Sequence, residues 1–501
     1  MRILPRSRRA WLALTILLLL LTLLFLATSD NAAIWPVRNT LLYQATRWWE
    51  AHVGPLHPAG VGALYGCVRG VGAVPLASAA VIVAERDGAV HQAQADARGC
   101  YEIAGLPAGR YVPIVSAPGY DAAAIRPWGL PARIGAGDRT QLDAALVPLS
   151  LPAVRPGLML QISAPVTLTW ALPQPGMAVR RQLSYDSGGR PNQLTYLYTP
   201  VAAGDAPLPT LLAVYPGAAD TWEGVSIPLA AAGYAVVAVG PAYALDLEDD
   251  IAELQRLVAF ARAGALPGAD GERMALLGGS YSSLHVQALL ERDSGFRGVV
   301  LLGGISDIFD MRRRFEHGSF IPPFGLDQAL IALGTPDISP ERPWRYSSRF
   351  HLRRGLPPML LMHSRNDEIV PFQQSEQLAA DLARLGVPHE AHFFDGLSHY
   401  LLADQPSAEL TSLYDLTLAF LRRTLLVRFQ RDHDYTVFGS FAPVRYRARS
   451  AMMLLERAGN SPHYVQERLY GNAHRLDSCF ILCLCTDRPD DRGHRLDRPE
   501  G

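Results

Sequence analysis

Five short and almost uninterrupted apolar runs constrain the fold of this chain more than any other feature. They occupy residues 211–214, 235–239, 274–277, 299–302 and 359–362. Runs of this kind suit strands that are covered on both faces, as the strands of parallel sheets are. Segments with helical periodicity lie between them, at 249–262 and 373–385. The alternation predicts a doubly wound, mostly parallel α/β sheet over residues 179–425, whose ligands bind beyond the carboxyl ends of the strands.

The third apolar run ends at two glycines and presents Ser280 just before a helix-compatible segment. On such a sharp strand–turn–helix the serine hydroxyl is exposed, and the N–H of the next residue, Tyr281, points at the group under attack. Small residues are needed two positions on either side of the serine, and Gly278 and Ser282 meet that need. Ser280 is therefore the candidate nucleophile and the Tyr281 N–H a candidate oxyanion donor. A helix-capping serine is the non-catalytic alternative, and Ser282 or Ser283 becomes the nucleophile only if the turn is displaced.

Residues that complete a catalytic triad follow two later strands. Asp367 comes after the run at 359–362, and His399 comes after a strand predicted at 392–394. The order serine, acid, histidine is the order that α/β-hydrolases use. His399 then takes the proton from Ser280, while Asp367 orients the imidazole ring and stabilises its charged form. Asp307, after the run at 299–302, is the rival acid; a turn-capping Asp367 and a surface-loop His399 are the non-catalytic alternatives.

A second oxyanion donor is expected after the early strand at 211–214. Tyr215, Pro216, Gly217 and Ala218 follow that strand. The N–H of Ala218 is the candidate donor. Tyr215 stands where α/β-hydrolases more usually carry a histidine.

This set of motifs resembles the α/β-hydrolase fold, and within it the prolyl oligopeptidase catalytic domain and the dienelactone hydrolases. The segments Asp-Glu-Ile-Val-Pro-Phe-Gln-Gln-Ser at 367–375 and Leu-Gly-Val-Pro at 385–388 carry the likeness. The resemblance implies a serine hydrolase that works through an acyl-enzyme. Two features depart from it. Serines occupy positions 282 and 283, where prolyl oligopeptidases usually have glycines, and the chain has no room for their β-propeller.

Short β-like runs broken by glycine and proline precede this region, over residues 60–148, and predict a small antiparallel sandwich. The segments at 97–103 and 105–111 resemble the carboxypeptidase regulatory-like family, which implies a non-catalytic spacer or adhesion module. Cys67 and Cys100 lie in this domain. Either they form a disulfide outside the cytoplasm, or they are two small buried hydrophobic residues.

The first 30 residues carry an export signal. Four arginines within residues 1–9 precede an uncharged, leucine-rich run at 10–27. As a helix that run is about 27 Å long, close to the thickness of a hydrocarbon core. It predicts a single-pass membrane helix that leaves the rest of the chain outside the cytoplasm. A cleaved signal peptide is the alternative, and either form exports the chain. Trp35, Trp48 and Trp49 suit a membrane interface or packing under the first domain.

Composition excludes some chemistries. The net charge of −1 provides no global field for nucleic acid. The sequence contains no lysine, which excludes a lysine base or Schiff base. Cys479, Cys483 and Cys485 lack paired metal-ligand spacing. We therefore expect neither a metal nor a cofactor.

Three further segments complete the expected organisation. Residues 149–177 are rich in proline and predict a linker. Residues 305–356 form an insertion between two core strands, with several aromatic residues, and are expected to cap the serine. The arginines of this cap suit anionic substrates or lipid headgroups, although a solvated face is the preferred interpretation. The tail at 426–501 has no clear periodicity and no assigned role.

Together these features predict an exported, membrane-anchored serine hydrolase that cleaves small carboxylic esters, or amides. The upstream sandwich is too small to filter substrates as a propeller does, so selection is expected to fall to the short aromatic cap. The first alternative is a peptidase of the prolyl oligopeptidase type that acts on short peptides. The second is a non-catalytic surface-binding protein that retains the hydrolase scaffold.

Overall fold

The computed structural model describes the chain in segments up to residue 426. The described residues are 8–29, 31, 33–55, 59–149, 160–171, 174–185, 194–202, 204, 206–241, 245, 247–293, 295–323, 325–399 and 407–426. The chain divides into one unit at 1–428 and another at 429–501, and the second lies outside the described residues. The predicted tail and the cysteines at 479, 483 and 485 therefore stay untested.

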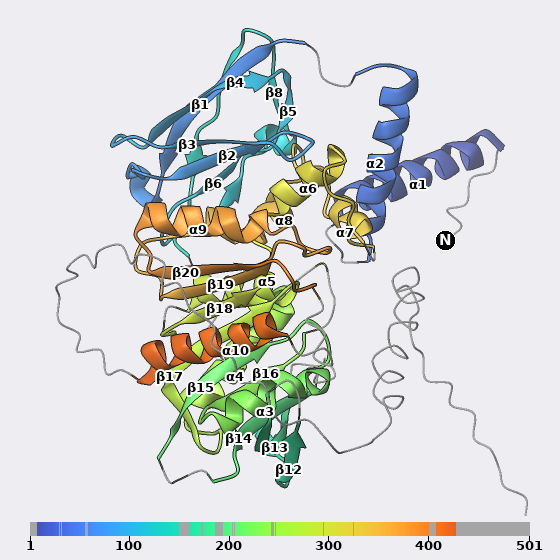
Figure 1. Cartoon of the computed structure of the whole chain (residues 1–501). Coiled ribbons are helices and arrows are strands. Elements are labelled where there is room, and N and C mark those ends of the chain that lie inside the picture. The colour runs from blue at the N-terminus through green and yellow to red at the C-terminus, as the bar shows by residue number, and fades with distance from the viewer. Residues whose placement is uncertain are drawn as a thin grey trace, which may run out of the picture. The chain divides into compact units, whose positions relative to one another are not determined.

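Ten strands of the described chain form one mixed, mostly parallel sheet (Figure 1), in the order β11-β13-β14-β16-β15-β17-β18-β19-β20, with β12 also paired to β13. The strands from β16 to β20 are all parallel. Their bounds are β11 (Leu160–Ile162), β12 (Val166–Trp170), β13 (Gly176–Tyr185), β14 (Thr195–Pro200), β15 (Leu208–Val214), β16 (Ala235–Val239), β17 (Ala269–Gly279), β18 (Val299–Leu302), β19 (Met359–Ser364) and β20 (His389–Phe394). The predicted doubly wound sheet is confirmed.

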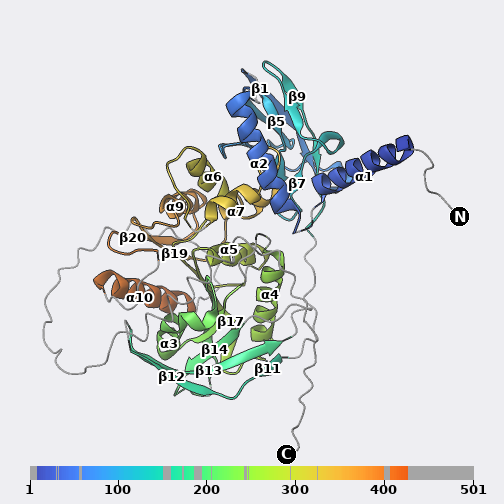
Figure 2. The same cartoon turned by 90° about the vertical axis from the view of Figure 1, so that its right-hand side faces the viewer.

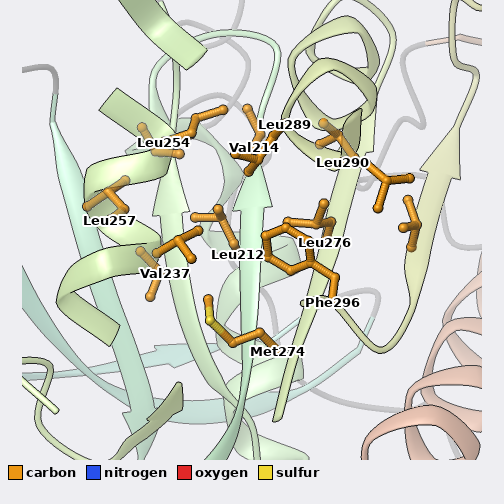
Figure 3. Close-up of a cluster of buried hydrophobic side chains, with 14 of the residues drawn as sticks. Leu212, Val214, Val237, Leu254, Leu257, Met274, Leu276, Leu289, Leu290 and Phe296 are labelled. Carbon is orange, nitrogen blue, oxygen red and sulfur yellow. The ribbon is translucent and has the colours of Figure 1, made fainter. Parts of the chain in front are cut away.

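Helices cover both faces of this sheet, as Figure 2 shows for α3 and α4. They are α3 (Glu223–Ala231), α4 (Glu248–Arg262), α5 (Ser282–Arg292), α9 (Gln373–Leu385) and α10 (Ala408–Leu421). On one face, leucines of α4 and α5 pack against Leu212, Val237 and Leu276 of the strands (Figure 3). Each fully buried leucine of this kind contributes roughly 1.5–3 kcal/mol. This packing fixes the strand ends on which the site is built.

The predicted linker at 149–177 is wrong in part. Residues 160–162 and 166–170 pair with β13 and extend the sheet at its antiparallel edge. The alternating segment Val-Thr-Leu-Thr-Trp at 166–170 has the period of a strand. The prolines on either side of it hid that signal.

Upstream lies an all-β region whose short sheets enclose one apolar core, as predicted. The expectation that it is purely antiparallel is wrong in part, because β1 pairs with β9 and β10 in parallel. Along β1 buried and more exposed residues alternate, as they do in a strand with one face on a core. The strands are β1 (Val61–Arg69), β2 (Ala80–Ala84), β3 (Val90–Gln94), β4 (Cys100–Pro107), β5 (Gly109–Tyr111), β6 (Ile114–Ser116), β7 (Ala123–Ala124), β8 (Ala132–Ile134), β9 (Arg139–Gln141) and β10 (Ala144–Ala145).

Cys67 and Cys100 form a disulfide that joins the paired strands β1 and β4, which decides between the two expected states. The bridge closes a loop with a sequence separation of 33. A loop of this size limits the freedom of the unfolded sandwich and stabilises the folded domain by about 2–4 kcal/mol.

Replacement of both cysteines by serine should lower the unfolding temperature of the sandwich. The reason is that the unfolded chain of the variant is no longer constrained by the bridge. Calorimetry of the parent and the double variant measures the two unfolding temperatures. Hydrolysis at 25 °C serves as the control and should be unchanged, because the cysteines lie outside the catalytic domain. An unchanged unfolding temperature would mean that the bridge contributes nothing.

The N-terminal region contains two helices, α1 (Arg8–Thr28) and α2 (Trp35–His52). Among the residues that the structure describes, none of the helices combines the length and the apolar character that a membrane crossing needs. The predicted membrane span at 10–27 is therefore not supported, although those residues are helical. Trp35 is buried with residues of the cap, whereas Trp48 and Trp49 are exposed.

The insertion at 305–356 folds into α6 (Ile308–Glu316), α7 (Leu326–Ala332) and α8 (Glu341–Arg345). Two of its arginines contradict both expected roles. Arg312 is 2% exposed, and its side chain pairs with Glu316 at 2.7 Å. Arg349 pairs with Asp307 at 3.0 Å. These guanidinium groups are internal ion-pair partners, so neither forms a solvated face or a free anion site.

Candidate active site

Ser280 stands on a strained turn between β17 and α5. Its φ of +50° lies in the left-handed region, which non-glycine residues seldom adopt except where function requires it. The surrounding structure holds this conformation, because the Ser280 N–H donates to the Leu302 carbonyl at 3.0 Å. A Cβ at Gly278 would lie 2.6 Å from Val286 Cγ2, so only glycine allows the strand and the helix to approach this closely. The predicted strand–turn–helix is present.

The three predicted triad residues form one continuous chain of hydrogen bonds. His399 Nε2 lies 2.8 Å from Ser280 Oγ, and its Nδ1 lies 2.8 Å from Asp367 Oδ2. Nδ1 faces a carboxylate and so carries the proton, which leaves Nε2 to accept the serine hydroxyl proton. The side chain of His399 is 12% exposed and that of Asp367 is 2% exposed. This is the arrangement that general-base activation of a serine requires.

Several donors surround the carboxylate of Asp367. Its Oδ1 accepts the N–H groups of Ile369 and Val370 at 2.9 and 2.7 Å. Burial raises the pKa of Asp367, but hydrogen bonds from His363 and His399, with the His399 charge and the Val370 N–H, lower it more. The net pKa lies well below the usual range, so Asp367 is ionised at neutral pH. Because the folded-state pKa is depressed, the resulting stability is present above the unfolded pKa of about 3.9 and is lost as pH falls below it.

The rival residues have structural roles instead. Asp307 caps α6 by accepting the N–H of Asp310 at 3.0 Å. Ser282 Oγ donates to the Val214 carbonyl at 2.6 Å. Ser283 Oγ accepts the Ile305 N–H at 2.8 Å. None of the three replaces Ser280 or Asp367 in the chain of hydrogen bonds to His399.

The expected oxyanion donors flank the nucleophile turn and the end of β15. Tyr281 precedes α5, and Ala218 lies exposed before a short 3₁₀ turn, η3 (Ala219–Trp222). Tyr215 turns away from the site. Its hydroxyl lies 2.9 Å from Ser226 Oγ and its ring stacks on Trp222. That the N–H groups of Tyr281 and Ala218 point at one oxyanion stays a prediction.

Two residues near the triad were missed at the level of sequence. His363, at the end of β19, lies 3.2 Å from Asp367 Oδ2 through its Nε2. Gly303 has a φ of +54°, and a Cβ there would lie 3.2 Å from the same Asp367 oxygen. Both lie at the carboxyl ends of central strands, where ligands bind on such sheets. That position in the sequence is the feature that could have identified them. Within the described residues, no group of His, Cys, Asp and Glu side chains is placed so that it could bind a metal ion.

A strained serine after a central parallel strand, in line with a histidine and a buried carboxylate, defines the serine hydrolases of the α/β-hydrolase fold. Comparison with known proteins agrees with that class. Residues 250–427 match the prolyl oligopeptidase family, and residues 63–147 match the carboxypeptidase regulatory-like domain. The chain therefore carries a prolyl oligopeptidase family domain that contains Ser280, Asp367 and His399, preceded by a carboxypeptidase regulatory-like domain.

Individual relatives are distant. The uncharacterized peptidase YuxL of Bacillus subtilis (strain 168) is 24% identical over 135 residues, which are 27% of this chain and 20% of that protein. The match thus spans about a fifth of the length of this curated relative. Among solved structures, a butyrate-bound esterase of Thermogutta terrifontis is 18% identical, with a TM-score of 0.37, covering 48% of this chain and 91% of its own. An acylaminoacyl peptidase of Pyrococcus horikoshii is 16% identical, with a TM-score of 0.40, covering 70% and 54%.

Proposed function

We propose that this chain is a serine hydrolase that cleaves small carboxylic esters through an acyl-enzyme. The observation that carries the proposal is the hydrogen-bond chain from Asp367 through His399 to Ser280. In the first half-reaction Ser280 Oγ attacks the carbonyl carbon and passes its proton to His399 Nε2. His399 then protonates the leaving alkoxide as the carbon–oxygen bond breaks. Water attacks the acyl-enzyme in the second half-reaction, with His399 again as base, and releases the acid and free Ser280.

The local backbone supports this chemistry. The candidate oxyanion donors are the N–H groups of Tyr281 and Ala218. Both belong to segments where glycines allow a close approach between neighbouring stretches of the chain. A Cβ at Gly240, directly after β16, would lie 1.7 Å from the Gly217 carbonyl oxygen, so the loop before Ala218 packs here only because residue 240 is glycine. Donors held in this way stabilise the developing oxyanion without reorganisation.

Esters are preferred over peptides for a physical reason. Amide cleavage needs stronger protonation of its leaving group than ester cleavage does, and the upstream sandwich is too small to act as a size filter. Peptidase activity is the second candidate, and the match of residues 250–427 to the prolyl oligopeptidase family favours it. Both candidates use the same three side chains.

The proposal includes that the enzyme acts outside the cytoplasm. The disulfide between Cys67 and Cys100 supports it, because such bonds persist in oxidising compartments and are rare in the cytosol. Attachment of the chain to a membrane through its first residues stays a prediction from sequence. Protease treatment of spheroplasts tests the orientation, since digestion of the catalytic domain is expected and its protection would reverse the orientation. Release of the whole chain into the medium would contradict the attachment.

The test of bond preference compares two classes of substrate, esters and anilides, with one preparation of the full chain. We expect a higher kcat/KM for p-nitrophenyl butyrate than for dipeptidyl or prolyl p-nitroanilides. Because esters are intrinsically more reactive, each rate is corrected by the rate of the Ser280→Ala variant. An anilide rate that depends on Ser280 and on a proline or a free N-terminus, and that matches the ester rate, would overturn the ester assignment in favour of the peptidase.

A further inference from the structure

His363 is a fully buried histidine that the triad mechanism leaves without a role. It is the last residue but one of β19 and is 0% exposed. Its Nδ1 lies 2.7 Å from the hydroxyl of Ser375 at the start of α9. Its Nε2 lies 3.0 Å from the Val370 carbonyl oxygen and 3.2 Å from Asp367 Oδ2. The ring therefore links the helix to the carboxylate of the triad.

The partners of the ring determine its tautomer. Nε2 faces a carbonyl and a carboxylate, which only accept hydrogen bonds, so Nε2 carries the proton. Nδ1 faces a hydroxyl, which is able to donate, so Nδ1 accepts from Ser375. In this tautomer both nitrogens of the neutral imidazole have a hydrogen-bond partner. The Nε2–H of His363 is then shared between the Val370 carbonyl oxygen and Asp367 Oδ2, while His399 donates its Nδ1–H to the same carboxylate.

We propose that His363 is a positioning residue for the reaction, which holds Asp367 in line with His399 and draws part of the carboxylate charge away from His399. The sequence Ser375–His363–Asp367–His399–Ser280 thus runs hydroxyl, imidazole, carboxylate, imidazole, hydroxyl. Each of its links is between 2.7 and 3.2 Å. This inference rests on the proposed function, because it concerns the same triad.

Few charged groups among the described residues lie next to this series of hydrogen bonds. Asp367 is contacted by His363, which belongs to β19, and by His399, which belongs to the loop after β20. Glu368, the neighbour of Asp367, accepts the backbone N–H of His399 at 3.1 Å through Oε2. From the end of β18 the neighbour of Asp367 is Gly303, which carries no charge. Loss of the His363 donor therefore leaves more of the carboxylate charge on the His399 side, which favours the imidazolium.

The test is the pH dependence of kcat/KM for p-nitrophenyl butyrate, measured with the full chain. His363→Phe removes both ring nitrogens, and we expect kcat to fall roughly tenfold to hundredfold with KM nearly unchanged. The acid limb of the profile, which reports the free-enzyme ionisation of His399, should move up by about half a pH unit to one unit. His363→Gln is the matched variant, since its amide N–H replaces Nε2–H, and its limb should return toward that of the parent.

Ser375→Ala provides a second route, because it leaves His363 in place and removes only the hydroxyl that fixes the ring. We expect a smaller shift in the same direction. A merely structural His363 would lower the unfolding temperature and kcat without moving the acid limb, so an unmoved limb in the folded variants contradicts the proposal. A parent that shows no hydrolysis dependent on Ser280 instead contradicts the proposed function, and the two failures are therefore distinct.

Discussion

Ser280→Ala should lower kcat/KM for p-nitrophenyl butyrate by roughly 10³–10⁶, the range expected when a triad loses its nucleophile. The reason is that Oγ forms the bond to the substrate carbonyl, and neither of the other two serines on this described turn is placed to replace it. Ser282 and Ser283 are committed to backbone partners on the same turn. Steady-state kinetics of the parent and the variant, with circular dichroism to check the fold, measure the effect.

Ser283→Ala is the control for this variant. It removes a hydroxyl from the same turn, but one whose hydrogen bonds go to the backbone of Ser280 and Ile305. It should lower stability by about 1 kcal/mol for each hydrogen bond lost and leave most of the rate. If Ser283→Ala lost as much activity as Ser280→Ala, the loss at 280 would reflect damage to the turn.

Asp367→Asn should lower kcat by about 10⁴, the size of the loss seen when a triad acid becomes an amide. The amide has no negative charge to stabilise the His399 imidazolium. Its NH₂ group also favours the tautomer in which Nδ1 accepts, and Nε2 then carries a proton and no longer serves as a base. The pH–rate profile and kcat at its plateau measure both effects.

Asp307→Asn is the matched control, because Asp307 is the rival acid at the end of the neighbouring strand. Its carboxylate caps α6 and pairs with Arg349. Loss of that charge should lower the unfolding temperature while the rate stays within a few-fold of the parent. If the two variants exchanged their effects, Asp307 would be the catalytic acid and the assignment of Asp367 would be wrong.

Much of this arrangement could be predicted from the sequence, because it follows from local patterns at strand ends. The apolar runs identified the central parallel strands, and Ser280, Ala218 and Asp367 lie within a few residues of the end of one of them, whereas His399 follows the separate strand at the sheet edge. Chain order did not separate Asp367 from Asp307, because both lie between Ser280 and His399; the hydrogen bond to His399 decides for Asp367. The disulfide remained open at that level, since spacing alone does not show that Cys67 and Cys100 are register partners on adjacent strands.

The features that the sequence concealed depend on contacts between distant segments. Arg349 looks like a surface charge until it is seen beside Asp307 and Asp381, whereas other cap arginines, such as Arg313 and Arg354, are exposed as expected. In the sequence His363 only follows a buried strand, and its contact with the hydroxyl of Ser375 arises only when α9 packs back on the sheet. Residues 160–170 look like a linker until β13 offers them an edge to pair with.

The most direct test of the central claim is the site of covalent modification. The full chain is treated with a fluorophosphonate probe, digested and mapped by mass spectrometry. We predict a single phosphonyl adduct on Ser280 Oγ in the parent and none in Ser280→Ala. Labelling should also slow below the pH at which His399 becomes protonated, because the imidazolium no longer serves as a base. A parent that does not label, or a Ser280→Ala variant that labels as fast as the parent, would contradict the assignment of Ser280 as the nucleophile of a serine hydrolase.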